Sequence, residues 1–319
     1  MLRSLTNVFS PARFQGGHKR RRYFEGYYLK IVDPQQNIAL ALIPGLSYDA
    51  QGEGHAFVQV LDGVGGTAHY HRFGVDEFDY ATTGFSLAIA GHHFSEEGIE
   101  CDLPGAVCSF SFRQNTSWPS SWYSPGAMGP FAFVPGMECR HGVVSLHHQV
   151  CGSLNGRKLS QRAVGYIEKD WGRSFPNNWV WMQSNHLGGA HQKRPSCLMV
   201  SAGRVPFAGT SFQGFIAALL LHGKLYRFTT YNGARMSLAF DAEHVDLQFS
   251  RKGTQLRLRV YPAPGVELVA PQGTGGMIGR VNESLQATAV FELSVPKSAT
   301  VHGQVEWLGF EVGGDWPAN

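Results

Sequence analysis

The sequence has no long apolar run. Its longest uninterrupted apolar segment is Phe215–Leu221, far shorter than the roughly 20 residues that a helix needs to cross a bilayer. Met1–Phe9 also lacks the apolar segment of a secretory signal peptide. We therefore expect no transmembrane helix, and we expect a cytoplasmic protein that is either free in solution or peripheral at a membrane surface.

Cysteine is scarce and shows neither a metal-binding nor a disulfide pattern. The chain of 319 residues holds five cysteines, an odd number, with no C-x-x-C pair. This spacing argues against a zinc site and against a disulfide framework. We therefore expect no metal site and reduced, mostly buried thiols at Cys101, Cys108, Cys139, Cys151 and Cys197.

Charged residues are few and nearly balanced. They make up 16% of the chain, with 27 basic and 24 acidic residues and a net charge of +3. Such a balance gives no support to nucleic-acid binding. The one basic cluster, His18–Arg22, fits two interpretations: a solvated N-terminal arm, or a contact with anionic lipid headgroups.

Helical periodicity is missing, and a period of two takes its place. In His55–Leu61, apolar residues at 56, 58 and 60 face one way. Val144–Cys151 alternates in the same manner, and "HVDLQFSRKGTQLRLRVY" (residues 244–261) predicts a hairpin that turns at Lys252–Gly253. Further strands are expected at residues 38–43, 85–90, 217–228, 285–295 and 304–312.

Regular strands separated by turns predict an all-β fold, a sandwich or a barrel. The chain length favours two such domains. The polar stretch Gly152–Arg162 holds an Asn-Gly turn and is the natural seam. We predict an N-terminal arm over residues 1–20, a first β-domain over 21–158 and a second over 159–319.

Polar and aromatic residues gather in "GYIEKDWGRSFPNNWVWMQSN" (residues 165–185), which we interpret as strand, loop and strand. Glu168 and Asp170 share one face of the first strand, and Lys169 points to the other. A carboxyl group beside a second carboxylate, or inside an apolar cavity, holds its proton more tightly than in water. The pair could therefore supply a general acid. The alternative is a surface ion pair with Lys169.

The second strand of this stretch places indoles and carboxamides on the same side: Trp179, Trp181, Gln183 and Asn185. Apolar walls with a few hydrogen-bonding groups are typical of a ligand cavity. The alternative is an aromatic core strand whose amides lie at its wet end.

A second dense stretch is "RRRYFEGYYLKIV" (residues 20–32). Glu25 and Tyr27 share one face of the expected strand, and Tyr28 and Lys30 share the other. A carboxylate within an aromatic run is either exposed at a sheet edge or directed into a polar pocket, and the pattern leaves both open.

These segments resemble the tocopherol cyclase family. "RRRYFEGYYLKI" resembles the family's N-terminal strand, although Tyr27 stands where family members often carry tryptophan. Residues 165–185 resemble its most specific signature, a Glu-Lys-Asn/Asp-Trp-Gly segment, then Phe-Pro, then a Trp-x-Trp-x-Gln-x-Asn strand. "APQGTGGMIGRVNESLQATAVFEL" (residues 270–293) resembles its C-terminal segment. A weaker similarity extends to carotenoid hydratase and Diels–Alderase-like proteins.

The resemblance implies two lipocalin-like (calycin) β-barrel or β-sandwich domains, with a ligand cavity at or near their junction. It also implies a cofactor-independent intramolecular lyase or isomerase that closes a prenylated hydroquinone to a chromanol. A proton adds to the alkene nearest the ring, and the phenolic oxygen closes on the tertiary cation. The lipophilic substrate is the expected partner.

The family's motifs assign roles to particular residues of this chain. Asp170 is the favoured proton donor, with Glu168 or Glu25 as the alternate or tuning carboxylate. The residues expected to contact substrate are Tyr27, Tyr28, Trp171, Trp179, Trp181, Gln183 and Asn185. Two alternatives stay open: a hydratase or pericyclic cyclase that acts on another terpenoid, and a non-catalytic carrier of a lipophilic quinone or pigment.

Overall fold

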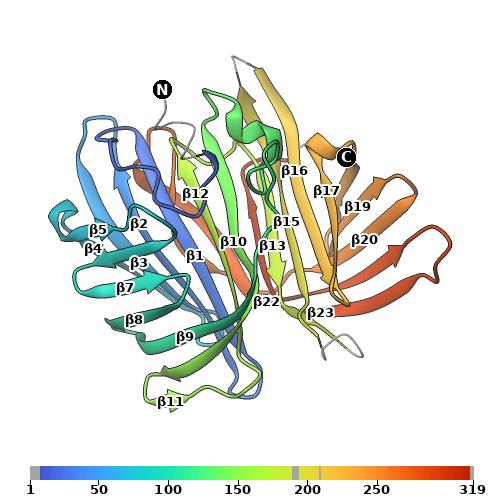
Figure 1. Cartoon of the computed structure of the whole chain (residues 1–319), viewed down its shortest axis with the longest axis horizontal. Helices are drawn as coiled ribbons and strands as arrows, with labels where there is room; N and C mark the ends of the chain where they lie inside the picture. The colour runs from blue at the N-terminus through green and yellow to red at the C-terminus, as the bar shows by residue number, and fades with distance from the viewer. Residues whose placement is uncertain (1–7, 189–193, 208–209, 317–319) are drawn as a thin grey trace. The chain divides into compact units, whose positions relative to one another are not determined.

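The computed structural model describes residues 8–188, 194–207 and 210–316, and these residues form two compact units built almost entirely of strands (Figure 1). The first unit runs to Phe175 and includes Glu267–Val281. The second comprises Pro176–Val266 and the chain from Asn282 onward. The predicted all-β fold with two β-units is confirmed.

The first unit is a 12-stranded antiparallel sheet that curls into a nearly closed barrel. Strand β12 lies in its middle, hydrogen-bonded to β1 on one side and to β10 on the other. In spatial order the strands are β4 (Thr67–Phe73), β3 (Gly54–Asp62), β2 (Ile38–Tyr48), β1 (Tyr23–Asp33), β12 (Val164–Gly172), β10 (Cys139–Leu154), β9 (Ala106–Thr116), β8 (Gly98–Leu103), β7 (His92–Ser95), β6 (Ser86–Ile89) and β5 (Phe78–Tyr80), with β11 (Arg157–Lys158) paired to β10.

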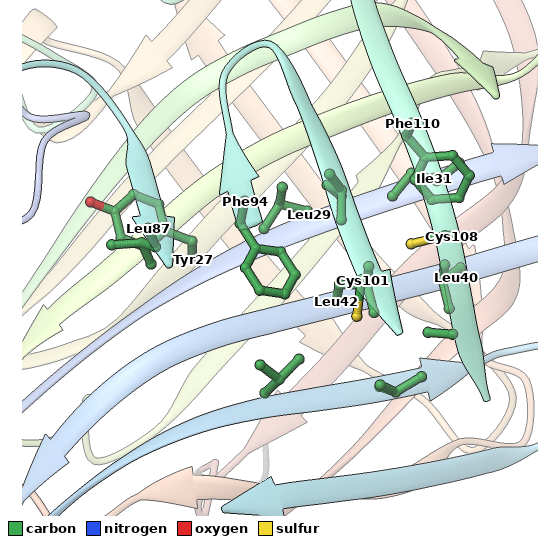
Figure 2. Packing of buried hydrophobic residues seen from close by; sticks show 14 of the residues in the cluster. Tyr27, Leu29, Ile31, Leu40, Leu42, Leu87, Phe94, Cys101, Cys108 and Phe110 are labelled. Atoms are coloured by element: carbon green, nitrogen blue, oxygen red, sulfur yellow. The ribbon is translucent and has the colours of Figure 1, made fainter. Parts of the chain in front are cut away.

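The period-two pattern accounts for the core of the first unit. On β1, Tyr27, Leu29 and Ile31 all point inward and are at most 1% exposed. Figure 2 shows them converging with residues of β2, β6, β7, β8 and β9, among them Cys101 and Cys108. All five cysteines are free; Cys101, Cys108 and Cys197 are buried, whereas Cys151 is exposed.

The second sheet has 11 antiparallel strands and forms the second unit with its own apolar core, except that β21 from Glu267 and β22 up to Val281 belong to the first unit. Val180 and Met182 of its strand β13 are fully buried in that core. In spatial order the strands are β17 (Lys224–Thr229), β16 (Thr210–Leu221), β15 (Cys197–Phe207), β13 (Trp179–Ser184), β23 (Val301–Gly313), β22 (Met277–Ser294), β20 (Thr254–Tyr261), β19 (Val245–Arg251) and β18 (Arg235–Phe240), while β14 (His186–Leu187) pairs with β23 and β21 (Val266–Pro271) pairs with β22.

Two-residue turns explain one confirmed strand prediction and one wrong one. Lys252 and Gly253 both have positive φ and join β19 to β20, as predicted. His222 and Gly223 form the same kind of turn between β16 and β17. The single strand expected at residues 217–228 is therefore wrong, and these residues form a hairpin. Both turn residues have a left-handed backbone, and the sequence shows a glycine at only one of the two, with His222 at the other.

The two units divide later in the chain than the predicted boundary between residues 158 and 159. Strand β12 begins at Val164 and pairs with β1 and β10, so it completes the first sheet. The division falls instead between Phe175 and Pro176, within the loop that separates β12 from β13. The N-terminal segment predicted as an arm also contributes to the first unit, because Phe14 is buried in its core.

Helical structure is limited in the described chain. Three short 3₁₀ turns have defined bounds, η1 (Val75–Glu77), η2 (Gly129–Phe133) and η4 (Thr230–Asn232). Among the residues described, we find no helix with the length and apolar character needed to traverse a lipid bilayer.

Residues 267–281 are fastened to the first unit by side-chain and backbone contacts. The Gln59 amide donates to the Val269 carbonyl at 2.9 Å and accepts from its N–H at 2.8 Å, as a backbone peptide would. Ser47 Oγ donates to the Gly275 carbonyl at 2.7 Å. Gly275 has φ +88°, and a Cβ there would lie 2.3 Å from the Tyr23 nitrogen. The sequence "GTGG" therefore serves close backbone packing at Gly275.

We expect Gly275→Ala to lower the free energy of unfolding by at least about 1 kcal/mol, because the methyl group adds a clash to an unfavourable φ. Gly273→Ala is the matched control, since Gly273 also has a positive φ but has open space around it. Denaturant unfolding followed by fluorescence measures both. Equal losses in the two variants would show that the close approach contributes nothing.

Candidate active site

Strand β12 sends the charged residues of the signature to opposite faces of the first sheet. Lys169 points inward, where it contacts the buried Tyr27. Glu168 and Asp170 alternate with it and point outward. Their shared face, and the opposite orientation of Lys169, are as predicted. The alternative of a surface ion pair is wrong, since Lys169 is fully buried.

Inside the barrel, Lys169 forms an ion pair with Glu25 of β1. Both side chains are 0% exposed. The Glu25 carboxylate also accepts from the Gln15 N–H at 2.9 Å, the Gly16 N–H at 2.9 Å and the Tyr23 hydroxyl at 2.5 Å. Every one of these partners is a donor, an arrangement that suits a deprotonated carboxylate. Glu25 thus lies in a polar pocket, one of the two positions left open by the sequence.

Aromatic rings complete the surroundings of the buried ammonium group. Lys169 Nζ lies 4.6 Å from the Tyr27 ring centroid and 4.7 Å from that of Trp171, close enough for cation–π attraction. It also donates to the Arg13 carbonyl at 2.7 Å and the Tyr27 hydroxyl at 3.1 Å. Burial lowers the pKa of Lys169, and the Glu25 charge partly offsets that effect.

Tyr27 and Trp171 are therefore neighbours of Lys169, on the face opposite Glu168 and Asp170. Tyr27 also stacks on Phe85, with ring centroids 4.1 Å apart. The three predicted carboxylates do not meet in one place: Glu25 belongs to the inner group and the other two to the outer one.

The outer group is centred on His141 of β10, which is cross-strand from Asp170. His141 Nδ1 lies 3.0 Å from Asp170 Oδ1, and its Nε2 lies 3.4 Å from Glu168 Oε2. The Tyr166 hydroxyl donates to the same Glu168 oxygen at 2.5 Å. A chain of polar groups thus runs from Tyr166 through Glu168 and His141 to Asp170. The Asp170 side chain is the most accessible of the three charged groups, at 28% exposed.

The two carboxylates set the charge of His141. Burial lowers the pKa of this imidazole, but Glu168 and Asp170 more than offset that effect and raise it to about 9. His141 is consequently an imidazolium at neutral pH, hydrogen-bonded to Asp170. A carboxylate next to a cationic proton donor can accept and return a proton without crossing bulk water.

The register of β1 against β12 determines which residues of β1 lie beside Glu168 and Asp170. Tyr28 is directly opposite Glu168, and Gly26 is directly opposite Asp170. Directly opposed residues share a face, so Tyr28 is a neighbour of Glu168. Gly26 has no side chain to place beside Asp170, and Ile43 and Phe57 border the space above it, each 3.7 Å from where its Cβ would be.

His141, Glu168 and Asp170 are also the group in the described chain whose ligand atoms lie close enough to consider a metal, within 4.8 Å of one another. The two carboxylates, however, contact opposite nitrogens of the ring. The contacts fit a hydrogen-bonded chain better than a chelate.

The second half of the signature lies on β13 of the second unit. Val180 and Met182 enter the core, so Trp179, Trp181 and Gln183 occupy the other face, as predicted. The Trp179 Nε1–H donates to Glu311 of β23. Gln183 is 0% exposed and donates to Asn185 Oδ1 at 2.9 Å, and the Asn185 amide donates to the Ser196 carbonyl at 2.9 Å.

Several buried or partly buried polar residues of the two units were not predicted from the sequence. His141 and Tyr166 complete the outer group of the first unit. Glu283 and Glu311 face each other on β22 and β23 and are 2% and 9% exposed. These residues meet their partners only through the pairing of strands that are distant in the sequence. The alternation of apolar and polar residues in "RVNESLQ" does not indicate that the Glu283 carboxylate is buried.

Comparison with known proteins decides the family. The tocopherol cyclase-like family profile matches residues 106–314, more than half of the chain. The chain belongs to the tocopherol cyclase-like family. The expected cavity at the junction of the two units stays a prediction.

Individual relatives are distant. The chain is 25% identical over 146 residues to a probable chloroplastic tocopherol cyclase of Oryza sativa subsp. japonica, a match that covers 41% of this chain and only 30% of the rice protein. Among solved structures, CghA matches with TM-score 0.56 and 13% identity, over 92% of this chain and 88% of CghA. A putative AttH from Nitrosomonas europaea matches with TM-score 0.48 and 14% identity, over 96% and 95%. CghA supports the fold alone.

Breaking the inner ion pair should destabilise this family member strongly. Glu25→Gln leaves the Lys169 charge buried without a counter-ion, so we expect the free energy of unfolding to fall by about 3 kcal/mol or more. The matched control is Glu292→Gln, which breaks the exposed pair with Arg257 and should cost under about 1 kcal/mol. Denaturant unfolding of both variants measures the difference. A Glu25→Gln variant as stable as the control would contradict the assignment of a buried charge pair.

The charge of His141 should make stability depend on pH. Its folded-state pKa of about 9 exceeds the ordinary 6.5, so its contribution is complete below pH 6.5 and is lost as the pH rises through 9. We expect the stability difference between wild type and His141→Gln to be largest near pH 6 and to shrink above pH 9. Unfolding curves at a series of pH values test this. A difference that stays constant with pH would mean that His141 is neutral in the fold.

Proposed function

We propose that the protein is a cofactor-independent cyclase that converts a prenylated hydroquinone into a chromanol, with Asp170 as the group that delivers the proton. Family membership supports a cyclase- or isomerase-type reaction. The observation that carries the assignment within this chain is the contact of Asp170 with a charged His141 at the family signature.

The reaction needs one proton added to carbon and one removed from oxygen. His141 passes its proton to Asp170, and the resulting carboxylic acid protonates the alkene carbon, so the π bond breaks and a tertiary cation forms. The phenolic oxygen then bonds to the cationic carbon. The phenolic proton returns through the Asp170 carboxylate to His141. Substrate and product are isomers, and the enzyme ends in its starting charge state.

The neighbouring groups have distinct tasks in this scheme. Glu168 contacts the far nitrogen of His141 and, with the Tyr166 hydroxyl, orients the imidazole. We propose that substrate reaches Asp170, which is 28% exposed, on the side of Gly26, since this residue places no side chain of its own beside the carboxylate. General acid catalysis of this kind contributes typically about 10²–10⁴-fold to rate.

The inner pair serves the scheme indirectly. Glu25 is surrounded by donors inside the barrel, so we assign it to positioning Lys169 and β12 rather than to proton donation. Trp179, Trp181, Gln183 and Asn185 keep their proposed role as substrate-contacting residues.

The test incubates purified protein with prenylated hydroquinones of several tail lengths and identifies products by mass and NMR. We expect an isomeric chromanol from wild type. Asp170→Asn should lower kcat by about 10²-fold or more. His141→Gln should also lower kcat and should remove any decline in rate above pH 9. Asp246→Asn, in an exposed pair of the second unit, is the control and should leave the rate unchanged.

Other products would identify other functions. A product that retains water would indicate a hydratase, and tight binding with recovery of unchanged ligand would indicate a carrier. Full activity in both Asp170→Asn and Glu168→Gln would contradict a carboxylic acid as the proton donor.

A further inference from the structure

The connection between β9 and β10 is unusually apolar for an exposed segment. Residues 114–137, from the last three residues of β9 onward, contain no Asp, Glu, Lys, Arg or His; Glu138 follows directly before β10. Trp122 is 81% exposed, Tyr123 58% and Phe133 39%. The Trp122 and Tyr123 rings pack edge to face, 5.4 Å between centroids, and so present one aromatic surface. We name residues 114–137 the aromatic loop.

The N-terminal segment extends this surface. Phe9 is 47% exposed, and its ring packs edge to face on Phe133 with centroids 5.7 Å apart. Pro11 lies against Gly126, where a Cβ would come within 3.1 Å of the proline ring. Large exposed aromatics that gather in one patch indicate an interaction site.

The basic cluster leaves the barrel at the same end. Phe24 at the start of β1 and Cys139 at the start of β10 both pair with Gly172 of β12. The basic cluster ends just before β1 and the aromatic loop just before β10, so the two leave the sheet two strand spacings apart, about 10 Å. In Figure 1 the blue N-terminal segment and the green loop before β10 lie at the same end of the first unit.

Positive charge dominates that flank. His18–Arg22 are all exposed, and Lys19, Arg20, Arg21 and Arg22 carry four positive charges. Asp49 adjoins this cluster, since the Arg22 N–H donates to its backbone carbonyl, and its Oδ1 accepts from the backbone N–H groups of residues 51–53. Indole and phenol side chains beside a basic run match the boundary between lipid headgroups and acyl chains.

We propose that this end of the first unit docks on an anionic lipid bilayer, with Trp122, Tyr123, Phe133 and Phe9 entering the headgroup boundary and residues 19–22 contacting the headgroups. An anionic membrane would use both features, because the aromatic side chains suit the headgroup boundary and the cations suit its negative surface. The inference is independent of the reaction proposed above.

Flotation of the purified full chain with vesicles tests the proposal, using phosphatidylcholine alone and phosphatidylcholine mixed with phosphatidylserine. We expect binding to the mixed vesicles that weakens as salt increases. The double variant Trp122→Ser/Tyr123→Ser should bind at least about tenfold more weakly. Arg20→Gln/Arg21→Gln should lose the preference for anionic vesicles.

The matched controls are Val107→Ser, at the end of β9 away from the aromatic loop, and Tyr261→Ser, in the second unit; they remove exposed apolar side chains outside this surface, 49% and 42% exposed. Both should bind like wild type, and an unchanged thermal midpoint for every variant excludes misfolding. The proposal is overturned if wild type floats with neither vesicle, or if the aromatic-loop variant floats as well as the controls. It is also overturned if the variant only abolishes self-association measured by sedimentation.

Discussion

The ion pair between Glu25 and Lys169 constrains the whole first unit. Two full charges inside an apolar barrel are tolerated only when they neutralise each other and their remaining hydrogen-bonding capacity is met. Here the N-terminal segment supplies backbone donors from Gln15 and Gly16 and the acceptor at Arg13. The pair therefore fixes three pieces of chain at once: the segment before β1, β1 itself and β12.

With Lys169 held inward, strand geometry leaves no choice for its neighbours. Glu168 and Asp170 must face outward, and the register against β10 then delivers His141 between them. The lysine in the middle of the family signature is thus a structural anchor that orients the two acidic residues beside it. Sequence spacing alone treats the three as equals, but the strand sends Lys169 to the face inside the barrel and the two acidic residues to the opposite face, where Glu168 is also buried.

What the sequence could predict follows from the range of each interaction. Alternation is local, so the all-β fold, the faces of β12 and β13 and the hairpin at Lys252–Gly253 were all accessible. Pairing between strands is not local. Nothing near Cys139–Leu154 marks His141 as the partner of Asp170, and nothing near Glu25 marks Lys169 as its counter-ion. The later division between the units has the same cause, since β12 belongs to the first sheet only through its partners.

The glycine opposite Asp170 has a consequence for engineering. A Cβ at Gly26 would touch Ile43 and Phe57 at ordinary contact distance, 3.7 Å from each, so the barrel has room for a methyl group there. Under the proposed function, alanine at residue 26 would narrow the approach to Asp170 without altering any charge, which would shift selectivity toward slimmer molecules.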